Sequence, residues 1–393
     1  MRAALMPTFA PATEMVVVRG KGPFLYTQTG QKYLDFVSGV AVNCFGHAHP
    51  GLTQVLHEQA QTLWHSSNMF RVPQAERLAK RLVKHSFGDR VFFANTGAEA
   101  IETAIKAARL YHFESNNQRQ RIITFSNAFH GRTLATIAAG QNPAHMQGFM
   151  RGDFGFDQIP FEDIHALQAA VSEHTCAILL EPIQGEGGVR VFSKQFLRAV
   201  RALCDATGVL LIFDEIQCGI GRSGKLFAYQ TTGVAPDIMA IAKGLGGGFP
   251  ISACITREPI GVKMGLGSHG STFGGNPLAC AVANKVLDLV LAEQLLTGVL
   301  RHGEYFQTQL SGLATAHPAI FGASSGKGLM IGLTCNIPNT DVINCARANG
   351  LLIGISGNNQ VRLLPPLNIE KIHIDTAIAI LYSVAIQLES TGV

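Results

Sequence analysis

Two charged residues directly follow apolar runs in the middle of the chain. Asp214 closes the run Val209–Phe213, and Lys243 closes the run Ile238–Ala242. Short apolar runs rich in β-branched residues are typical of buried parallel strands. Open α/β sheets bind their ligands at the carboxyl ends of such strands. We therefore expect Asp214 and Lys243 at one sheet edge, where they are part of a ligand site, form a structural ion pair, or simply start solvated loops.

The chemistry that this pair suits best is that of an aldehyde cofactor. The amine of Lys243 can carry an aldehyde as a Schiff base, and the carboxylate of Asp214 can hold a pyridine nitrogen in its protonated form. The pair alone does not identify the cofactor as a phosphate ester, and it does not exclude a dinucleotide.

A candidate phosphate site follows the apolar run Val91–Phe93. Thr96 and Glu99 have the spacing of a helix capping box, and Gly97 and Ala98 are small enough for a ligand to approach the backbone. The N-terminus of a helix offers free N–H groups and a partial positive charge. Since most capped helices bind nothing, this motif is weak by itself.

Two further candidates follow the predicted strand Ile122–Phe125. Phe129 suits stacking on a flat heteroaromatic ring, and Arg132 suits a bidentate contact with a carboxylate. The alternative places Phe129 in the core and Arg132 in solvent.

Three more segments carry polar groups in unusual places. Glu186 lies in a glycine-rich loop and can face a cation, or it is a solvated loop carboxylate. Ser271 and Thr272 supply hydroxyls in a second glycine-rich loop, ahead of a helix that Asn276 caps. Arg362 interrupts an apolar strand and needs an anionic partner, either protein or substrate.

A nicotinamide or flavin site would depend on the segment Gly219–Gly224, which fits G-x-G-x-x-G. Residues Asp214–Cys218 separate these glycines from the preceding strand, where a dinucleotide fold needs a tight turn. The following segment, Lys225–Gly233, is too short for the required helix. The pattern therefore disfavours a dinucleotide.

The composition restricts the class of protein. The chain has 393 residues, of which 47% are hydrophobic and 15% charged, and its net charge is only +4. We expect about two domains, no nucleic-acid partner, and subunit contacts over part of the surface. No apolar stretch approaches the roughly 18 residues of a membrane span, and no clear cleavage signal is present, so the sequence predicts an unprocessed cytoplasmic protein.

The spacing of the cysteines and histidines indicates neither disulfides nor a metal site. None of the eight cysteines forms a C-x-x-C pair, which predicts reduced thiols. His47 and His49 are two residues apart without nearby acidic or thiol companions, so we expect no metal site.

The elements that must position these residues alternate between strand and helix. Residues 15–37 predict small antiparallel strands, and helices are expected near 52–64 and 73–86. Strands are then expected at 91–93, 121–125, 175–180, 209–213 and 238–242, with a helix at 193–207. Beyond the long helix that starts at Asn276, strands are expected at 329–333, 351–355 and 361–364, and a closing helix at 375–388. The alternation predicts an α/β fold with a mostly parallel sheet.

These segments, in this order, resemble the class III aminotransferases of the ornithine/acetylornithine type. The resemblance covers nearly the whole chain, and it rests on specific motifs: Asn95-Thr96-Gly97-Ala98-Glu99-Ala100, Phe129-His130-Gly131-Arg132-Thr133, Leu180-Glu181-Pro182-Ile183-Gln184-Gly185-Glu186-Gly187-Gly188, Phe213-Asp214-Glu215-Ile216-Gln217, Ala242-Lys243-Gly244 and Gly270-Ser271-Thr272-Phe273-Gly274-Gly275-Asn276-Pro277. It implies the fold-type I scaffold with pyridoxal 5′-phosphate. It also implies an N-terminal segment (1–48) that joins a smaller α+β domain (283–393), and a large cofactor domain (49–282).

The resemblance also implies a role for each candidate residue. Lys243 would be the Schiff-base lysine, Asp214 the partner of the pyridine nitrogen, Gln217 the partner of the ring hydroxyl, and Phe129 the stacking ring. Gly97 and Ala98 would hold the phosphate, joined by Thr272 from the other subunit of a homodimer. Arg132 would bind the α-carboxylate of the donor, with Ser271 beside it, and Glu186 and Arg362 would form a glutamate–arginine gate.

The reaction that the resemblance implies is amino transfer from N2-acetyl-L-ornithine to 2-oxoglutarate, as in arginine biosynthesis. Ornithine, succinylornithine, succinyldiaminopimelate and γ-aminobutyrate remain alternative donors, because the same cofactor residues serve all of them. Family members often carry a tyrosine or an acidic residue where this chain has Phe70 or Thr27, and Ile101 replaces a commoner asparagine. The acyl-group preference therefore stays open.

Overall fold

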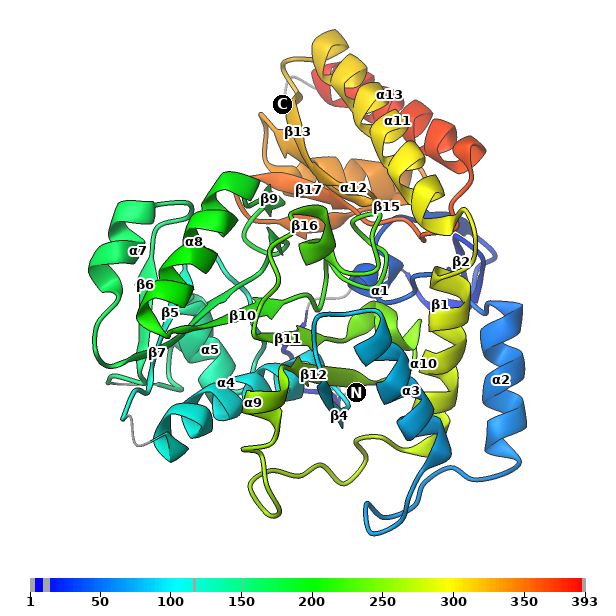
Figure 1. Cartoon of the computed structure of the whole chain (residues 1–393). Helices are drawn as coiled ribbons and strands as arrows, with labels where there is room; N and C mark the ends of the chain where they lie inside the picture. The colour runs from blue at the N-terminus through cyan, green and yellow to red at the C-terminus, as the bar shows by residue number, and fades with distance from the viewer. Residues whose placement is uncertain (1–3, 10–14, 116–117, 151, 391–393) are drawn as a thin grey trace.

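A seven-stranded sheet forms the centre of the molecule (Figure 1). The computed structural model describes residues 4–9, 15–115, 118–150 and 152–390. The strand order is β4-β12-β11-β10-β7-β5-β6, and only β12 runs antiparallel to its neighbours. The strands are β4 (Arg90–Ala94), β5 (Arg121–Phe125), β6 (Phe156–Ile159), β7 (Thr175–Leu180), β10 (Leu210–Asp214), β11 (Ile238–Ile241) and β12 (Ser252–Thr256). The predicted mostly parallel sheet is confirmed.

Helices cover both faces of this sheet because its strands are apolar on both sides. Leu211 belongs to one buried cluster, and its neighbour Ile212 belongs to another, as the alternation of side chains along a strand requires. One cluster contains residues of α4 and α5, and the other contains residues of α3, α8 and α10. The helices around this sheet are α2 (Pro50–Ala60), α3 (Pro73–Lys84), α4 (Gly97–Glu114), α5 (Leu134–Gly140), α6 (Pro143–Met146), α7 (Ile164–Ala170), α8 (Lys194–Thr207), α9 (Glu258–Gly261) and α10 (Pro277–Val290).

The two ends of the chain build a second region, at the top and right of Figure 1. One sheet has the order β1-β2-β3-β15, in which β3 and β15 pair in parallel, and another has the order β13-β14-β17-β16. Its elements are β1 (Val17–Lys21), β2 (Phe24–Thr27), β3 (Lys32–Asp35), α1 (Ser38–Ala41), α11 (Leu295–Ala316), β13 (Phe321–Lys327), β14 (Met330–Cys335), α12 (Asn339–Ala348), β15 (Leu351–Leu352), β16 (Gly354–Ser356), β17 (Gln360–Leu363) and α13 (Lys371–Ser390). The predicted antiparallel N-terminal strands are confirmed.

The sequence pattern missed some elements. It did not predict helix α11, strand β13 or the antiparallel strand β12. The expected strand at 351–355 is broken at Ile353, and α13 is longer than the predicted closing helix. The cap of α10 is as expected, since the side chain of Asn276 accepts a hydrogen bond from Ala279 N at 2.8 Å.

Helix α13 corrects the expectation about apolar length. It is the one helix of the described residues that is long and apolar enough to cross a membrane. Its residues Ile374, Ile378 and Leu381 are buried at helical spacing in the main core cluster. An apolar stripe of this kind is what a helix packed on a globular core requires, and α13 lies against α11 and α12.

The glycine motif connects the central sheet region to the C-terminal region. The first element after Gly224 is the short 3₁₀ helix η1 (Ala228–Thr231), so the motif does not lead directly into an α-helix. Arg222 is buried, and its guanidinium donates to the carbonyl oxygens of Leu329 and Pro365. This geometry does not match a dinucleotide-binding turn, and the motif is a structural contact.

His47 has an acidic partner that the sequence did not reveal. Its Nε2 lies 2.7 Å from Oδ2 of Asp35, which is 2% exposed. The second carboxylate oxygen, Oδ1, accepts hydrogen bonds from the backbone N–H groups of Val37 and Ser38, so the pair holds a turn. All eight cysteines are free, as predicted.

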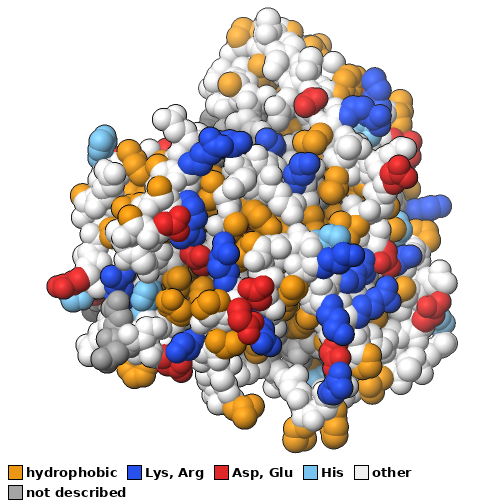
Figure 2. Space-filling view, in the orientation of Figure 1, with side chains coloured by type: hydrophobic (Ala, Val, Ile, Leu, Met, Phe, Trp, Pro, Cys, Tyr) orange, Lys and Arg blue, Asp and Glu red, His pale blue; other side chains and the backbone are white. Residues whose placement is uncertain are grey.

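The outer surface mixes both signs of charge. On the face drawn in Figure 2, basic and acidic side chains are interspersed over the helices and the loops between them. Exposed ion pairs of the molecule include Arg90 with Glu258 and Arg71 with Glu76. Exposed pairs of this kind contribute little to the stability of a fold, because water and salt screen them.

Candidate functional site

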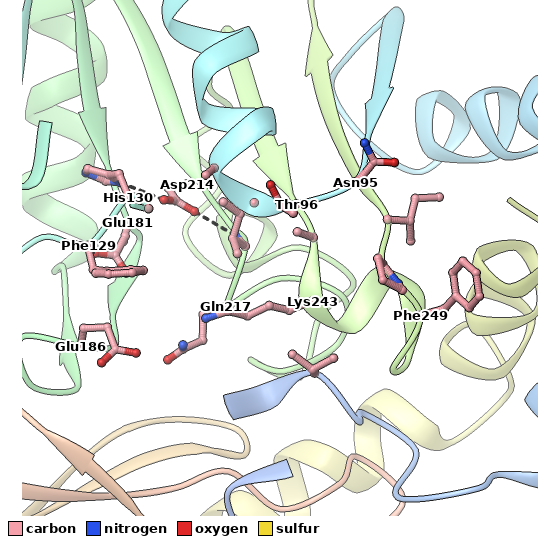
Figure 3. A pocket seen from close by; sticks show the side chains of 18 of the residues that line it. Asn95, Thr96, Phe129, His130, Glu181, Glu186, Asp214, Gln217, Lys243 and Phe249 are labelled. Atoms are coloured by element: carbon pink, nitrogen blue, oxygen red, sulfur yellow. Dashed lines mark hydrogen bonds and ion pairs between the residues drawn. The ribbon is translucent and has the colours of Figure 1, made fainter. Parts of the chain in front are cut away.

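A cavity of about 300 Å³ lies at the carboxyl ends of the central strands (Figure 3). Its walls come from the segments that follow β4, β5, β7, β10 and β11. Asp214 and Lys243 both line it, together with Gly97, Ala98 and Phe129. The sheet edge therefore brings together the residues that the sequence places after separate strands.

Asp214 is the last residue of β10, and a buried network fixes its carboxylate. The side chain is 4% exposed, and Oδ2 lies 2.8 Å from Nδ1 of His130, which follows β5. Oδ1 accepts a hydrogen bond from Ile216 N at 3.0 Å. The other ring nitrogen of His130, Nε2, is buried without a partner among the described residues. The carboxylate is therefore oriented before any ligand arrives.

Lys243 enters the same cavity from the end of β11. Its φ of 43° lies in the left-handed region, at the start of the 3₁₀ helix η2 (Lys243–Gly246). Burial is the main cause that lowers the pKa of its amine, and the charge of Arg362 lowers it further. The carboxylates of Glu186, Asp214 and Glu181 oppose this shift. An amine with a lowered pKa loses its proton more readily, as a nucleophile and a base require.

The N-terminus of α4 forms one end of the cavity. The Thr96 hydroxyl accepts from Glu99 N at 3.3 Å, and the Glu99 carboxylate accepts from Thr96 N at 2.6 Å, which confirms the capping box. A Cβ added to Gly97 would lie 2.9 Å from the side chain of Ile216, so the close packing there needs a glycine. Gly97 and Ala98 thus present helix N–H groups to the cavity, which fits a phosphate.

Glu186 and Arg362 form an ion pair at the edge of the cavity. Nη2 of Arg362 lies 2.9 Å from the carboxylate of Glu186, and Nη1 donates to the amide oxygen of Gln217 at 2.9 Å. The Arg362 side chain is 3% exposed, whereas that of Glu186 is 36% exposed. The anionic partner that the strand arginine needed is therefore a protein carboxylate.

Phe129 lines the cavity, and Arg132 lies beyond it. The backbone N–H of Phe129 donates to the Glu181 carboxylate at 3.0 Å. The Arg132 guanidinium carbon lies 5.7 Å from the centre of the Phe129 ring, and Arg132 faces two adjoining hollows. It makes no hydrogen bond or ion pair within the described part of the chain.

Ser271 and Thr272 are not part of this cavity. The hydroxyl of Ser271 accepts hydrogen bonds from Asn95 Nδ2 and from Gly274 N, and Thr272 is exposed. Neither residue lines the space around Lys243. The structure of one chain therefore does not bring them to the other candidate residues.

Two polar residues of the site were missed at the sequence level. His130 binds Asp214, and Glu181 is 5% exposed at the end of β7, where it faces the same cavity. Burial, with a smaller contribution from the charge of Asp214, raises the pKa of Glu181 to about 7. Glu181 ends an apolar strand just as Asp214 does, and that signal is visible in the sequence.

Comparison with known proteins identifies the family. The family model for class III aminotransferases matches residues 7–385. The chain belongs to the class III aminotransferases. An acetylornithine aminotransferase of Agrobacterium fabrum is 51% identical over 366 residues, which are 93% of this chain and 92% of that protein.

Solved structures of this family show the same fold. An ornithine aminotransferase of Toxoplasma gondii superimposes with a TM-score of 0.94 at 32% identity, and covers 99% of this chain and 94% of its own. An acetylornithine aminotransferase of Elizabethkingia anophelis has a TM-score of 0.86 at 34% identity, with 97% and 96% covered. The chain is thus an aminotransferase of fold type I, and its cofactor is pyridoxal phosphate, as in the family.

Proposed function

We propose that this class III aminotransferase transfers the amino group of N2-acetyl-L-ornithine to 2-oxoglutarate, giving N-acetylglutamate 5-semialdehyde and L-glutamate. The observation that carries the proposal is one cavity that joins Lys243, Asp214 and a glutamate–arginine pair. The 51% identity to an acetylornithine aminotransferase over most of the chain supports the choice of donor.

We propose the following residues for the cofactor. Lys243 would bind its aldehyde carbon, Asp214 its pyridine nitrogen and Gln217 its ring hydroxyl, while Phe129 would cover the ring face. Gly97 and Ala98 would hold the phosphate with their backbone N–H groups. The cofactor, when bound, supplies an electron sink that stabilises negative charge at the substrate carbon.

The chain's own side chains would orient the cofactor and transfer the proton. Asp214, oriented by His130, would hold the ring nitrogen through its carboxylate. Lys243, whose pKa is lowered by burial, would take the proton from the substrate carbon that bears the transferred amino group and would deliver it to the cofactor carbon, because burial disfavours the ammonium form.

Two arginines would distinguish the two substrates. Arg132, which makes no hydrogen bond or ion pair within the described residues, would bind the α-carboxylate of the donor. Ser271 would lie beside it only from the other subunit, since Ser271 of the same chain lines neither the cavity nor the two hollows that Arg132 faces. Arg362 is covered by Glu186 when the donor binds and is uncovered for the second carboxylate of 2-oxoglutarate or glutamate. One cavity can then accept two substrates of different charge.

We further propose a cytoplasmic homodimer with the active sites at the subunit interface. Thr272 is exposed and lies outside the cavity of its own chain, as expected of a residue that reaches the phosphate in the other subunit. Within each subunit, residues 49–282 would form the large cofactor domain, and 1–48 with 283–393 the smaller domain. The parallel pairing of β3 with β15 supports the union of these two ends.

A panel of amino donors with 2-oxoglutarate as acceptor tests the function. We expect the highest kcat/KM with acetylornithine, compared with ornithine, succinylornithine, succinyldiaminopimelate and γ-aminobutyrate. A higher kcat/KM with any other donor would contradict the assignment. Colourless protein whose spectrum is insensitive to borohydride would contradict the cofactor.

A further inference from the structure

Two hollows adjoin the cavity of Lys243, and the same residues link all three spaces. The hollows measure about 680 and 670 Å³, and each shares Phe129 and Glu186 with the inner cavity. Arg132 and His145 line both hollows but not the inner cavity. A donor that reaches from Lys243 to Arg132 therefore places its far end beside His145.

His145 is held in position by a short helix and by an aromatic contact. It lies on α6, whose first turn is capped by the Asn142 side chain, which accepts from Ala144 N at 3.0 Å. Its ring meets the Phe129 ring edge-on, with 6.1 Å between centroids and an angle of 87°. Neither ring nitrogen has a hydrogen-bond partner within the described residues, so both are available to a ligand.

The surroundings of His145 favour the neutral form of its imidazole. Burial lowers its pKa from the ordinary value of 6.5, and the charge of Arg132 lowers it further, against a smaller opposing effect of Glu186. A neutral imidazole offers one N–H donor and one nitrogen acceptor. This pair of groups complements a neutral amide, which has one N–H and one carbonyl.

The surroundings are unfavourable for an ammonium group. Among the described residues that line the two hollows, Glu186 is the one carboxylate, and Arg362 already pairs with it. The remaining charge there is the cation of Arg132. A free α-ammonium would meet the like charge of Arg132, and the one carboxylate nearby already pairs with Arg362, whereas an acylated nitrogen carries no charge.

We propose that His145 is a specificity-determining residue that selects an acylated amino donor by a hydrogen bond to its amide. The inference rests on the proposed function, in which Arg132 binds the α-carboxylate. The amide nitrogen and the carboxylate are attached to the same carbon, so a carboxylate at Arg132 brings the amide among the residues around Arg132. His145 is the neutral hydrogen-bonding side chain that both hollows share with Arg132.

Three donors that differ only at one carbon test this role in the holoenzyme. Acetylornithine carries an amide there, ornithine an ammonium, and 5-aminopentanoate only hydrogen. In His145→Phe, which keeps the ring contact but removes both polar groups, the kcat/KM ratio of acetylornithine to 5-aminopentanoate should fall about tenfold, the value of one hydrogen bond. His145→Gln should restore part of this ratio.

A carboxylate at the same place should favour the unacylated donor. In His145→Asp, the kcat/KM ratio of ornithine to 5-aminopentanoate should rise at least about tenfold, through a charge-assisted hydrogen bond. His174→Phe is the matched control, since that side chain is 67% exposed just before β7, at the opposite end of the sheet. It should leave both ratios as in the wild type.

The results separate this inference from the proposed function. If the wild type already shows no preference for acetylornithine over 5-aminopentanoate, the proposed function fails, and the inference fails with it. If the wild type prefers acetylornithine and His145→Phe keeps that ratio within twofold, the inference alone is overturned. Normal cofactor absorbance in each variant verifies that the site is assembled.

Discussion

Asp214 and Glu215 are consecutive buried carboxyl residues on opposite sides of the sheet edge. Asp214 faces the cavity, where His130 and the backbone of Ile216 orient it. Glu215 is 0% exposed and faces the interior, where its oxygens accept hydrogen bonds from Ala228 N and Tyr229 N. Neighbouring residues at a strand end point in opposite directions, so one edge serves both a ligand and the core.

The two carboxyl groups differ in what surrounds them. Burial raises the pKa of Glu215 to about 8, although two backbone N–H groups favour its charged form. Asp214 has an imidazole partner that can carry positive charge. Burial alone therefore produces a carboxyl group that holds a turn, whereas burial beside an ionisable partner and an open cavity produces one that can act on a ligand.

The strongest test of the cavity side is Lys243→Ala. Without the amine, kcat should fall by about 10⁴-fold or more, since both covalent attachment and proton transfer are lost. The variant should still bind pyridoxal phosphate non-covalently, which absorbance before and after gel filtration measures. Turnover near the wild-type rate would overturn the role of Lys243.

A smaller loss is expected from Asp214→Asn, which keeps the shape of the side chain but removes its charge. We expect kcat to fall by about 10²–10³-fold, as for the loss of one preorganised electrostatic contact. The melting temperature should change by less than about 3 °C, because the amide oxygen can accept from Ile216 N while the amide NH2 donates to Nδ1 of His130. An unchanged kcat would contradict the contact with the ring nitrogen.

The ion pair at the cavity edge should have a moderate effect. Glu186→Gln frees Arg362 from its charged partner, so kcat/KM with glutamate as the donor should rise about tenfold relative to that with acetylornithine. Glu173→Gln, whose parent side chain is 88% exposed, is the control. Equal changes of kcat/KM for glutamate and acetylornithine would contradict the proposal that Glu186 covers and uncovers Arg362.

Substitution of Glu215, which faces the core, should change the stability of the fold and not kcat. Glu215 has a folded pKa of about 8 against an ordinary value of 4.5, so its contribution to stability is complete below pH 4.5 and is lost as the pH rises to 8. The slope is at most about 1.4 kcal/mol per pH unit. Relative to Glu215→Gln, the melting temperature of the wild type should therefore decrease from pH 5 to pH 8.

Parallel melting curves over that range would show that Glu215 does not titrate there. The kcat of Glu215→Gln should stay within about threefold of the wild type, because Glu215 does not line the cavity. A loss as large as that of Asp214→Asn would remove the distinction between the two sides of the edge.

The sequence predicted the cavity side well because its signals are local. A charge after an apolar strand identifies Asp214 and Lys243, and cap spacing identifies the N-terminus of α4. The partners of these groups depend on tertiary contacts: His130 lies 84 residues before Asp214 in the chain, and Glu186 lies 176 residues before Arg362. Such pairs have no periodic signal.

The errors in predicting the fold from the sequence have similar physical causes. Strand β12 was not predicted because an antiparallel strand inside a parallel sheet has the same apolar pattern as any buried segment. The acidic companion of His47 was not predicted because Asp35 lies twelve residues away, at the end of β3. The length of α13 was underestimated because polar residues on the outer face of the helix interrupt its apolar sequence.

The pairing of β3 with β15 has a consequence for folding during synthesis on the ribosome. The central sheet uses strands between Arg90 and Thr256, so it can assemble while the C-terminus is still being made. The free edge of β3 must wait for Leu351 before it finds its neighbour. During that interval the nascent chain exposes an unpaired strand edge, which is the kind of surface that chaperones protect.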